Sequence, residues 1–147
     1  MNDNMTKFLK EIEVFGFKKT CSIIKGPNHP LFDGLMSDSE TGIVYLWIAN
    51  NPPEILYIGS TSLRLFDRCK SHIGGFKGNS AKGLELKEKL NKIFKAKRSI
   101  DVFSKKSKAV NCFGRKVSSQ ESEERALLEI YNKNYTLWNF SKKGKLI

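Results

Sequence analysis

GIVYLWIANNPPEILYIG, residues 42–59, contains two apolar runs that are rich in β-branched and aromatic residues. The runs GIVYLWIA (42–49) and ILYIG (55–59) are joined by NNPPE, whose asparagines and prolines are typical of a turn. The sequence therefore predicts a β-hairpin. A turn centred in this loop places Tyr45 opposite position 57 or 59. In either register Tyr45 and Tyr57 share one face of the sheet, because side chains alternate along a strand with a period of two.

Helix and strand patterns continue on both sides of this hairpin. Residues 6–15 repeat apolar side chains at helical spacing, whereas the Pro-, Gly-, Asn- and Asp-rich stretch from 16 to 41 is expected to be a loop. The elements expected downstream are a helix from about 63 to Gly74–Gly75, a helix over 84–97, a strand over 99–103 with a candidate return strand over 109–113, a basic loop over 104–108, and a helix over 119–133. The predicted fold class is α/β (α+β), with a small, mainly antiparallel three-stranded sheet flanked by helices.

The positive charge of the chain lies in its last two-thirds. The 147 residues carry a net charge of +11, yet residues 1–41 hold five basic and six acidic side chains. We therefore treat 42–147 as one cationic domain and 1–41 as an N-terminal extension of unknown role. A cationic surface attracts polyanions, because each phosphate contact releases a counterion. Nucleic acid is the predicted partner.

Cysteine usage and hydropathy argue against several other classes of protein. Cys21, Cys69 and Cys112 are odd in number and far apart, which argues against a structural zinc site and suits a reducing compartment. The first sixteen residues are broken by charges and lack the apolar stretch of a secretory signal. No run approaches the roughly 20 apolar residues of a membrane span. We therefore expect a cytoplasmic protein with no membrane partner.

The hairpin and the helix after it resemble the GIY-YIG nuclease family. GIVY (42–45) and YIG (57–59) resemble the two motifs that define the family, although the first reads G-I-V-Y rather than G-I-Y. YIGSTSLRLFDRCKSH (57–72) is similar to the family's strand–turn–helix. Arg68 matches the arginine of that helix, and His72 matches a histidine or tyrosine found in part of the family.

Two further elements extend the resemblance to about residues 42–139. ERALLEIY (124–131) resembles the helix that carries the family's single metal-binding carboxylate, which would be Glu124. LWN (137–139) resembles the C-terminal asparagine motif, although the segment before Asn139 is long for the family. The residues that the resemblance assigns to the catalytic site are Tyr45, Tyr57, Arg68, His72, Glu124 and Asn139.

The resemblance implies a metal-dependent endonuclease that hydrolyses DNA phosphodiester bonds and leaves 5′-phosphate and 3′-hydroxyl ends. It implies Tyr45 or its hydrogen-bonded partner as general base, and Tyr57 as the residue that orients water or phosphate. Glu124 would bind Mg²⁺ or Mn²⁺, and we expect Asn139 to brace the site by hydrogen bonds. The planar guanidinium of Arg68 suits a phosphate.

Two steps of this chemistry need help from neighbouring groups. A phenol with a pKa near 10 is a poor base at neutral pH, but a metal or an arginine favours its ionised form. His72 could then relay the proton. Taken singly, Tyr45 and Tyr57 would be ordinary core aromatics, and Arg68 and His72 would be solvated side chains. The ordered combination is what indicates a site.

The last helix offers two candidate carboxylates. Glu124 lies about 40° from the centre of the apolar stripe of that helix, and Glu123 lies about 60° away on the other side. A carboxylate that faces a core needs a metal or a cation as partner, because unpaired burial is costly. Glu124 is therefore the predicted metal ligand, with Glu123 in reserve.

Double-stranded DNA is the expected substrate, and basic side chains should hold it across the catalytic face. The residues predicted to bind it are Arg64, Lys87, Lys105, Lys106, Lys108, Arg115 and Lys116. The sequence leaves open a restriction-type enzyme or a weakly specific repair, phage or toxin nuclease, and a monomer or a homodimer. The alternative outside the enzyme class is a non-catalytic nucleic-acid-binding module that retains the fold.

Overall fold

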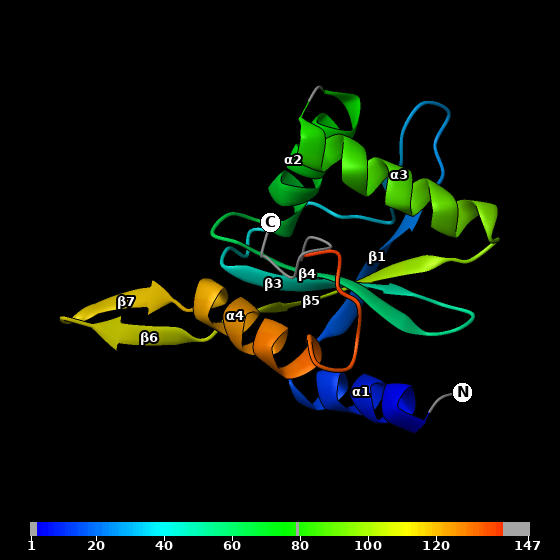
Figure 1. Cartoon of the computed structure of the whole chain (residues 1–147). Helices are drawn as coiled ribbons and strands as arrows, with labels where there is room; N and C mark the ends of the chain where they lie inside the picture. Colours follow the sequence, from blue (N-terminus) through cyan, green and yellow to red (C-terminus); the bar gives the residue numbers. More distant parts are fainter. Residues whose placement is uncertain (1–2, 79, 140–147) are drawn as a thin grey trace.

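The computed structural model describes residues 3–78 and 80–139 of the chain. Figure 1 shows the arrangement of its helices and strands. In chain order they are α1 (Asp3–Val14), β1 (Lys18–Ile24), β2 (Leu31–Asp33), β3 (Ile43–Ala49), β4 (Glu54–Thr61), α2 (Leu65–Lys77), α3 (Ala81–Lys95), β5 (Ile100–Lys106), β6 (Ala109–Cys112), β7 (Arg115–Ser118) and α4 (Gln120–Tyr131). The described part of the chain contains no helix with the length and apolar character needed to cross a membrane.

The main sheet has five strands in the order β2-β1-β5-β3-β4, and each neighbouring pair is antiparallel. The expected antiparallel sheet flanked by helices is thus present, but the expected number of three strands is wrong. Both additional strands come from residues 16–41, which were expected to form a loop. Strand β1 pairs with β5 and β2 pairs with β1, so residues 18–24 and 31–33 of this N-terminal segment belong to the sheet.

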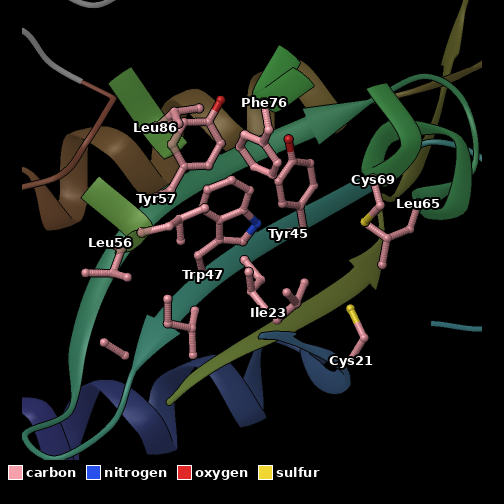
Figure 2. Close-up of a cluster of buried hydrophobic side chains, with 14 of the residues drawn as sticks. Cys21, Ile23, Tyr45, Trp47, Leu56, Tyr57, Leu65, Cys69, Phe76 and Leu86 are labelled. Carbon is pink, nitrogen blue, oxygen red and sulfur yellow. The ribbon is translucent and has the colours of Figure 1, made fainter. Parts of the chain in front are cut away.

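The predicted hairpin is confirmed as β3 and β4. Tyr45 pairs with Gly59, which is one of the two registers expected, and the register shifts by one residue after Trp47. Tyr45 and Tyr57 belong to the same buried cluster on one face of the sheet, as the two-residue period requires. Figure 2 shows the two phenol rings side by side, with their hydroxyl groups at the same end.

Helices cover both faces of the sheet (Figure 1). Helices α2 and α3 pack on the face that carries the tyrosines, and α1 and α4 pack on the opposite face. Alternate residues of β3 supply the two cores, with Tyr45 and Trp47 in one and Val44 and Leu46 in the other. The sheet therefore holds Tyr45 under α2 and holds α4 against the back of β4.

Three local expectations are wrong. Helix α2 continues past Gly74–Gly75 to Lys77. Gly83 of α3 lies close to this turn of α2, since a Cβ atom on Gly83 would be 2.3 Å from the carbonyl oxygen of Gly75. Strand β5 includes residues 104–106 of the expected basic loop, since these residues pair with β3. Residues 109–112 do not return along the main sheet; they pair with β7 in a separate two-stranded sheet.

Candidate active site

The two tyrosines are fixed by the register of the hairpin. Their ring centroids lie 6.2 Å apart, and the exposed fractions are 1% for Tyr45 and 3% for Tyr57. The Tyr45 ring lies over Gly59, where a Cβ atom would come within 2.3 Å of Cζ and 2.4 Å of the hydroxyl oxygen. The glycine of the second motif is therefore needed as space for the tyrosine of the first.

Helix α2 brings Arg68 and His72 to the Tyr45 hydroxyl. Nε of Arg68 donates a hydrogen bond to that hydroxyl at 3.1 Å, and Nε2 of His72 lies 2.8 Å from it. The predicted closeness of these three residues is confirmed. His72 is buried, so the alternative of an ordinary solvated side chain does not hold for this residue. Its ring packs between Trp47 and Phe76, at centroid distances of 4.9 Å and 6.3 Å.

Burial controls the protonation of Tyr45 and His72. It raises the pKa of the Tyr45 phenol far above its ordinary value, even though the charge of Arg68 acts in the opposite direction. Arg68 thus favours the ionised tyrosine, as expected, but the loss of solvation on burial is larger. Burial, together with the charge of Arg68, lowers the pKa of His72 to about 3. At neutral pH the imidazole is neutral and Tyr45 is protonated.

Glu124 lies beside Ser60 at the open edge of β4 and acts on Tyr57. It projects from α4, is half-buried, and accepts a hydrogen bond from the Ser60 hydroxyl at 3.1 Å. Burial raises the pKa of its carboxyl group, which Ser60 and the charges of Lys82 and Arg68 partly offset. Burial also raises the pKa of Tyr57; the charge of Arg68 lowers it and that of Glu124 raises it. Charged groups from α2 and α4 therefore act on the same phenol.

Lys82 is a charged residue near the site that sequence reasoning missed. Its charge lowers the pKa of both His72 and Glu124, which come from different helices. It lies in the first turn of α3, just after the N-cap Ser80. The sequence held no signal that separates this lysine from the many others of α3.

Glu123, the reserve candidate, is fully occupied by partners in the chain. One carboxylate oxygen accepts from the ammonium group of Lys105, and the other accepts from the backbone N–H of Lys108 at 2.9 Å and from the Ser119 hydroxyl at 2.9 Å. These bonds lower the pKa of Glu123, although burial acts against them. Glu123 therefore ties α4 to the end of β5.

Asn139 makes both of its hydrogen bonds to one residue of β4. Its Oδ1 accepts from the backbone N–H of Ile58 at 2.9 Å, and its Nδ2 donates to the backbone carbonyl of Ile58. The side chain is buried and completes the open edge of β4, as a neighbouring strand would. Because Ile58 lies between Tyr57 and Gly59, this contact braces the second motif, as expected.

The donor set beside Glu124 fits a hard divalent cation. No cluster of three or more His, Cys, Asp or Glu side chains occurs among residues 3–78 and 80–139, so Glu124 would act as a lone carboxylate. Mg²⁺ keeps several water molecules and is often bound by one or two carboxylates together with substrate phosphate. The carboxylate of Glu124 and the hydroxyl of Ser60 are oxygen donors of that kind.

The basic residues expected to hold DNA have different environments. Arg64 forms a bidentate pair with Asp67, at 2.8 Å and 2.9 Å, and Lys105 is paired with Glu123. Lys87 is half-buried on α3. The remaining four are exposed at the end of β5 and on the β6–β7 hairpin: Lys106, Lys108, Arg115 and Lys116.

Two solved structures share this fold. The chain is similar to a glutamate-to-alanine mutant of bacteriophage T4 EndoII, with a TM-score of 0.61 and 14% identity, over 87% of this chain and 95% of that one. It is also similar to the restriction endonuclease HPY188I in complex with product DNA, with a TM-score of 0.50 and 16% identity, over 90% of this chain and 84% of that one. No protein-family model and no curated protein sequence matches the chain. At these identities the comparison shows a common fold that spans most of the chain.

Proposed function

We propose that this protein is a metal-dependent endonuclease that hydrolyses DNA phosphodiester bonds and leaves 5′-phosphate and 3′-hydroxyl ends. One observation carries the proposal: Arg68, hydrogen-bonded to Tyr45, and the half-buried Glu124 both act on Tyr57 at one edge of the sheet. The proposal is supported by the sequence resemblance to GIY-YIG nucleases. It is also supported by the fold shared with two proteins that are named endonucleases.

Each group has a role that its chemistry suits. Mg²⁺ or Mn²⁺ bound by Glu124 would supply a Lewis acid and lower the pKa of a water molecule. Arg68 presents a guanidinium to the non-bridging oxygens of the scissile phosphate, where negative charge grows in the transition state. The charges of Arg68 and Glu124 act in opposite directions on the Tyr57 phenol. Tyr57 orients the phosphate or the attacking water. Lys82 adds positive charge on the α3 side.

The proton of the attacking water leaves through Tyr45 and His72. The water donates to the phenol oxygen as the phenol passes its own proton to Nε2 of His72, which lies 2.8 Å away and is neutral. Hydroxide adds to phosphorus, the 3′-oxygen departs, and solvent protonates it. Burial keeps Tyr45 protonated and His72 neutral in the free protein, which is the state from which this relay starts. His72 then returns its proton to solvent, which restores the starting state.

Cleavage of supercoiled plasmid tests the proposal. We expect nicked or linear DNA with Mg²⁺ or Mn²⁺, none with EDTA, and no comparable degradation of single-stranded RNA. Arg68→Ala and Glu124→Ala should each lose at least about 10²-fold in rate. Glu129→Ala, an exposed carboxylate farther along the same helix, should cleave like the wild type. Tight plasmid binding with no cleavage under either metal would favour the non-catalytic module instead.

A further inference from the structure

The β6–β7 hairpin projects from the body of the protein (Figure 1). Its strands pair only with each other within the described residues, and every residue from 108 to 118 is exposed. A two-stranded ribbon that packs on nothing is marginally stable in water. The ribbon therefore contributes little to the cores of the domain, and its faces are open to a partner.

The tip of this ribbon carries an aromatic residue in an unfavourable conformation. Phe113 has φ +54° and Gly114 has φ +78°, between the paired residues Cys112 and Arg115. These values match a two-residue type I′ turn, for which Asn-Gly is the common sequence. Phe113 is fully exposed, and none of the described residues covers it. A bulky residue at positive φ is unfavourable, and here no contact within the described residues compensates for it. This indicates that Phe113 contacts another molecule.

The charge of the ribbon matches a polyanion. The sequence contains no Asp or Glu between Asp101 and Glu121, whereas Lys108, Arg115 and Lys116 are basic. Arg115 and Lys116 are consecutive on β7, so their side chains point to opposite faces. A ribbon with one cation on each face can contact the phosphates on both walls of a groove, and a two-stranded ribbon fits the major groove of B-DNA.

The base of the ribbon is fixed next to the candidate metal ligand. The backbone N–H of Lys108 donates to Glu123, and the carbonyl of Lys108 accepts from the backbone N–H of Ser119 at 3.1 Å. Ser119 is the N-cap of α4, and Glu123 directly precedes Glu124. The position of the ribbon relative to Glu124 is therefore set by a short, hydrogen-bonded connection.

We propose that the β6–β7 ribbon enters the major groove of duplex DNA, with Arg115 and Lys116 on phosphates of the two strands and Phe113 in apolar contact with base edges at the tip. The choice of DNA rests on the proposed nuclease function. The β6–β7 ribbon would then be the part of the molecule that selects duplex DNA over a single strand.

Binding measured in EDTA tests the ribbon separately from cleavage. The probes are a fluorescein-labelled duplex of about two helical turns and one of its strands, read by anisotropy over a range of salt concentrations. The variants are Phe113→Asn, which suits the type I′ turn better, and the pair Arg115→Gln with Lys116→Gln. The matched control is Lys10→Gln with Lys133→Gln, which removes two exposed lysines, one from α1 and one from the turn that follows α4.

Phe113→Asn should weaken duplex binding at least about fivefold through the loss of its apolar contact with base edges, and should weaken single-strand binding less, because a single strand has no groove. The double charge variant should reduce the slope of log K against log salt by about 2, and the control should leave that slope near the wild-type value. Equal losses on both probes, or wild-type affinity in both ribbon variants, would overturn the proposal. So would a wild-type dimer that Phe113→Asn converts to a monomer with unchanged duplex affinity, since the ribbon would then bind a second copy of the chain. If the ribbon variants bind duplex more weakly but the wild type cleaves no DNA, the nuclease proposal is contradicted and the ribbon proposal stands.

Discussion

The ring of Tyr45 lies over Gly59, so close that a Cβ atom on Gly59 would be 2.3 Å from Cζ of Tyr45. The two residues pair across the β3–β4 hairpin. The Tyr45 hydroxyl also contacts Arg68 and His72 on α2. The contact therefore links the two sequence motifs to the helix that carries the candidate phosphate-binding arginine.

Gly59→Ala should disrupt the site from within the sheet. The added methyl group must displace the Tyr45 ring, and the hydrogen bonds to Arg68 and His72 are lost with it. Overpacking of this kind costs about 1–3 kcal/mol in the free energy of unfolding. A misplaced catalytic group can cost about 10²-fold in rate. Urea unfolding and plasmid cleavage measure the two effects.

Gly74→Ala is the matched control for this change. Gly74 lies inside α2, and a Cβ atom there would meet nothing within 4 Å. Alanine in place of a helical glycine stabilises by up to about 1 kcal/mol, so this variant should be as active as the wild type and slightly more stable. Full activity in Gly59→Ala would contradict the steric role given to Gly59.

Glu123 and Glu124 should respond in opposite ways when each is replaced by glutamine. Glu123→Gln weakens the bonds to Lys105, Lys108 and Ser119, so the melting temperature should fall. Burial raises the pKa of Glu124, which means that its charged form is disfavoured in the folded state. Glu124→Gln should therefore melt at the wild-type temperature or above it at pH 7. A lower melting temperature for Glu124→Gln would indicate a structural role for that carboxylate.

Asn139→Ala should destabilise the protein by about 3 kcal/mol. The change leaves both backbone polar groups of Ile58 without the side-chain partner that they have in the wild type. Because Asn139 acts on β4 rather than on DNA, cleavage should weaken mainly through kcat, with KM changed little. Asn134→Ala removes an exposed amide from the same segment and should match the wild type in both measurements. A large rise in KM alone for Asn139→Ala would contradict the bracing role.

His72 should make stability depend on pH. Its pKa is about 3 in the folded protein and close to 6.5 when unfolded, so the unfolded state binds the proton more readily. The contribution of the neutral His72 imidazole to the free energy of unfolding is complete above pH 6.5 and is lost as pH falls towards 3. Between pH 6.5 and pH 4 the free energy of unfolding should fall by about 3 kcal/mol from this cause. His72→Gln should lack this component when the two unfolding free energies are compared across that range. Parallel curves for the two proteins would contradict a buried, neutral imidazole.

Local patterns predicted the hairpin and the pairing of its tyrosines, because the two-residue period of a strand fixes which side chains share a face. Strand β1 could not be predicted in the same way. Its sequence, KKTCSII, begins with lysines, and Cys21 and Ile23 are the residues it buries. Pairing with β2 on one side and with β5, far away in the chain, on the other makes it a strand.

The sequence did contain a signal for the burial of His72. Leu65, Cys69, His72 and Phe76 follow one another at spacings of four, three and four, and all four are buried. In contrast, the contacts that distinguish Glu123 from Glu124 come from β5 and β4. A helical wheel reports direction around one helix and holds no information about neighbouring elements.

Single-turnover cleavage of an end-labelled duplex in saturating Mg²⁺ tests the central claim most directly, with Glu124→Gln compared against Glu123→Gln. Glu124→Gln should be slower than the wild type by at least about 10²-fold, while Glu123→Gln should retain most of the rate at a temperature where it is folded. Wild-type cleavage by Glu124→Gln would contradict a metal-assisted site built around this carboxylate.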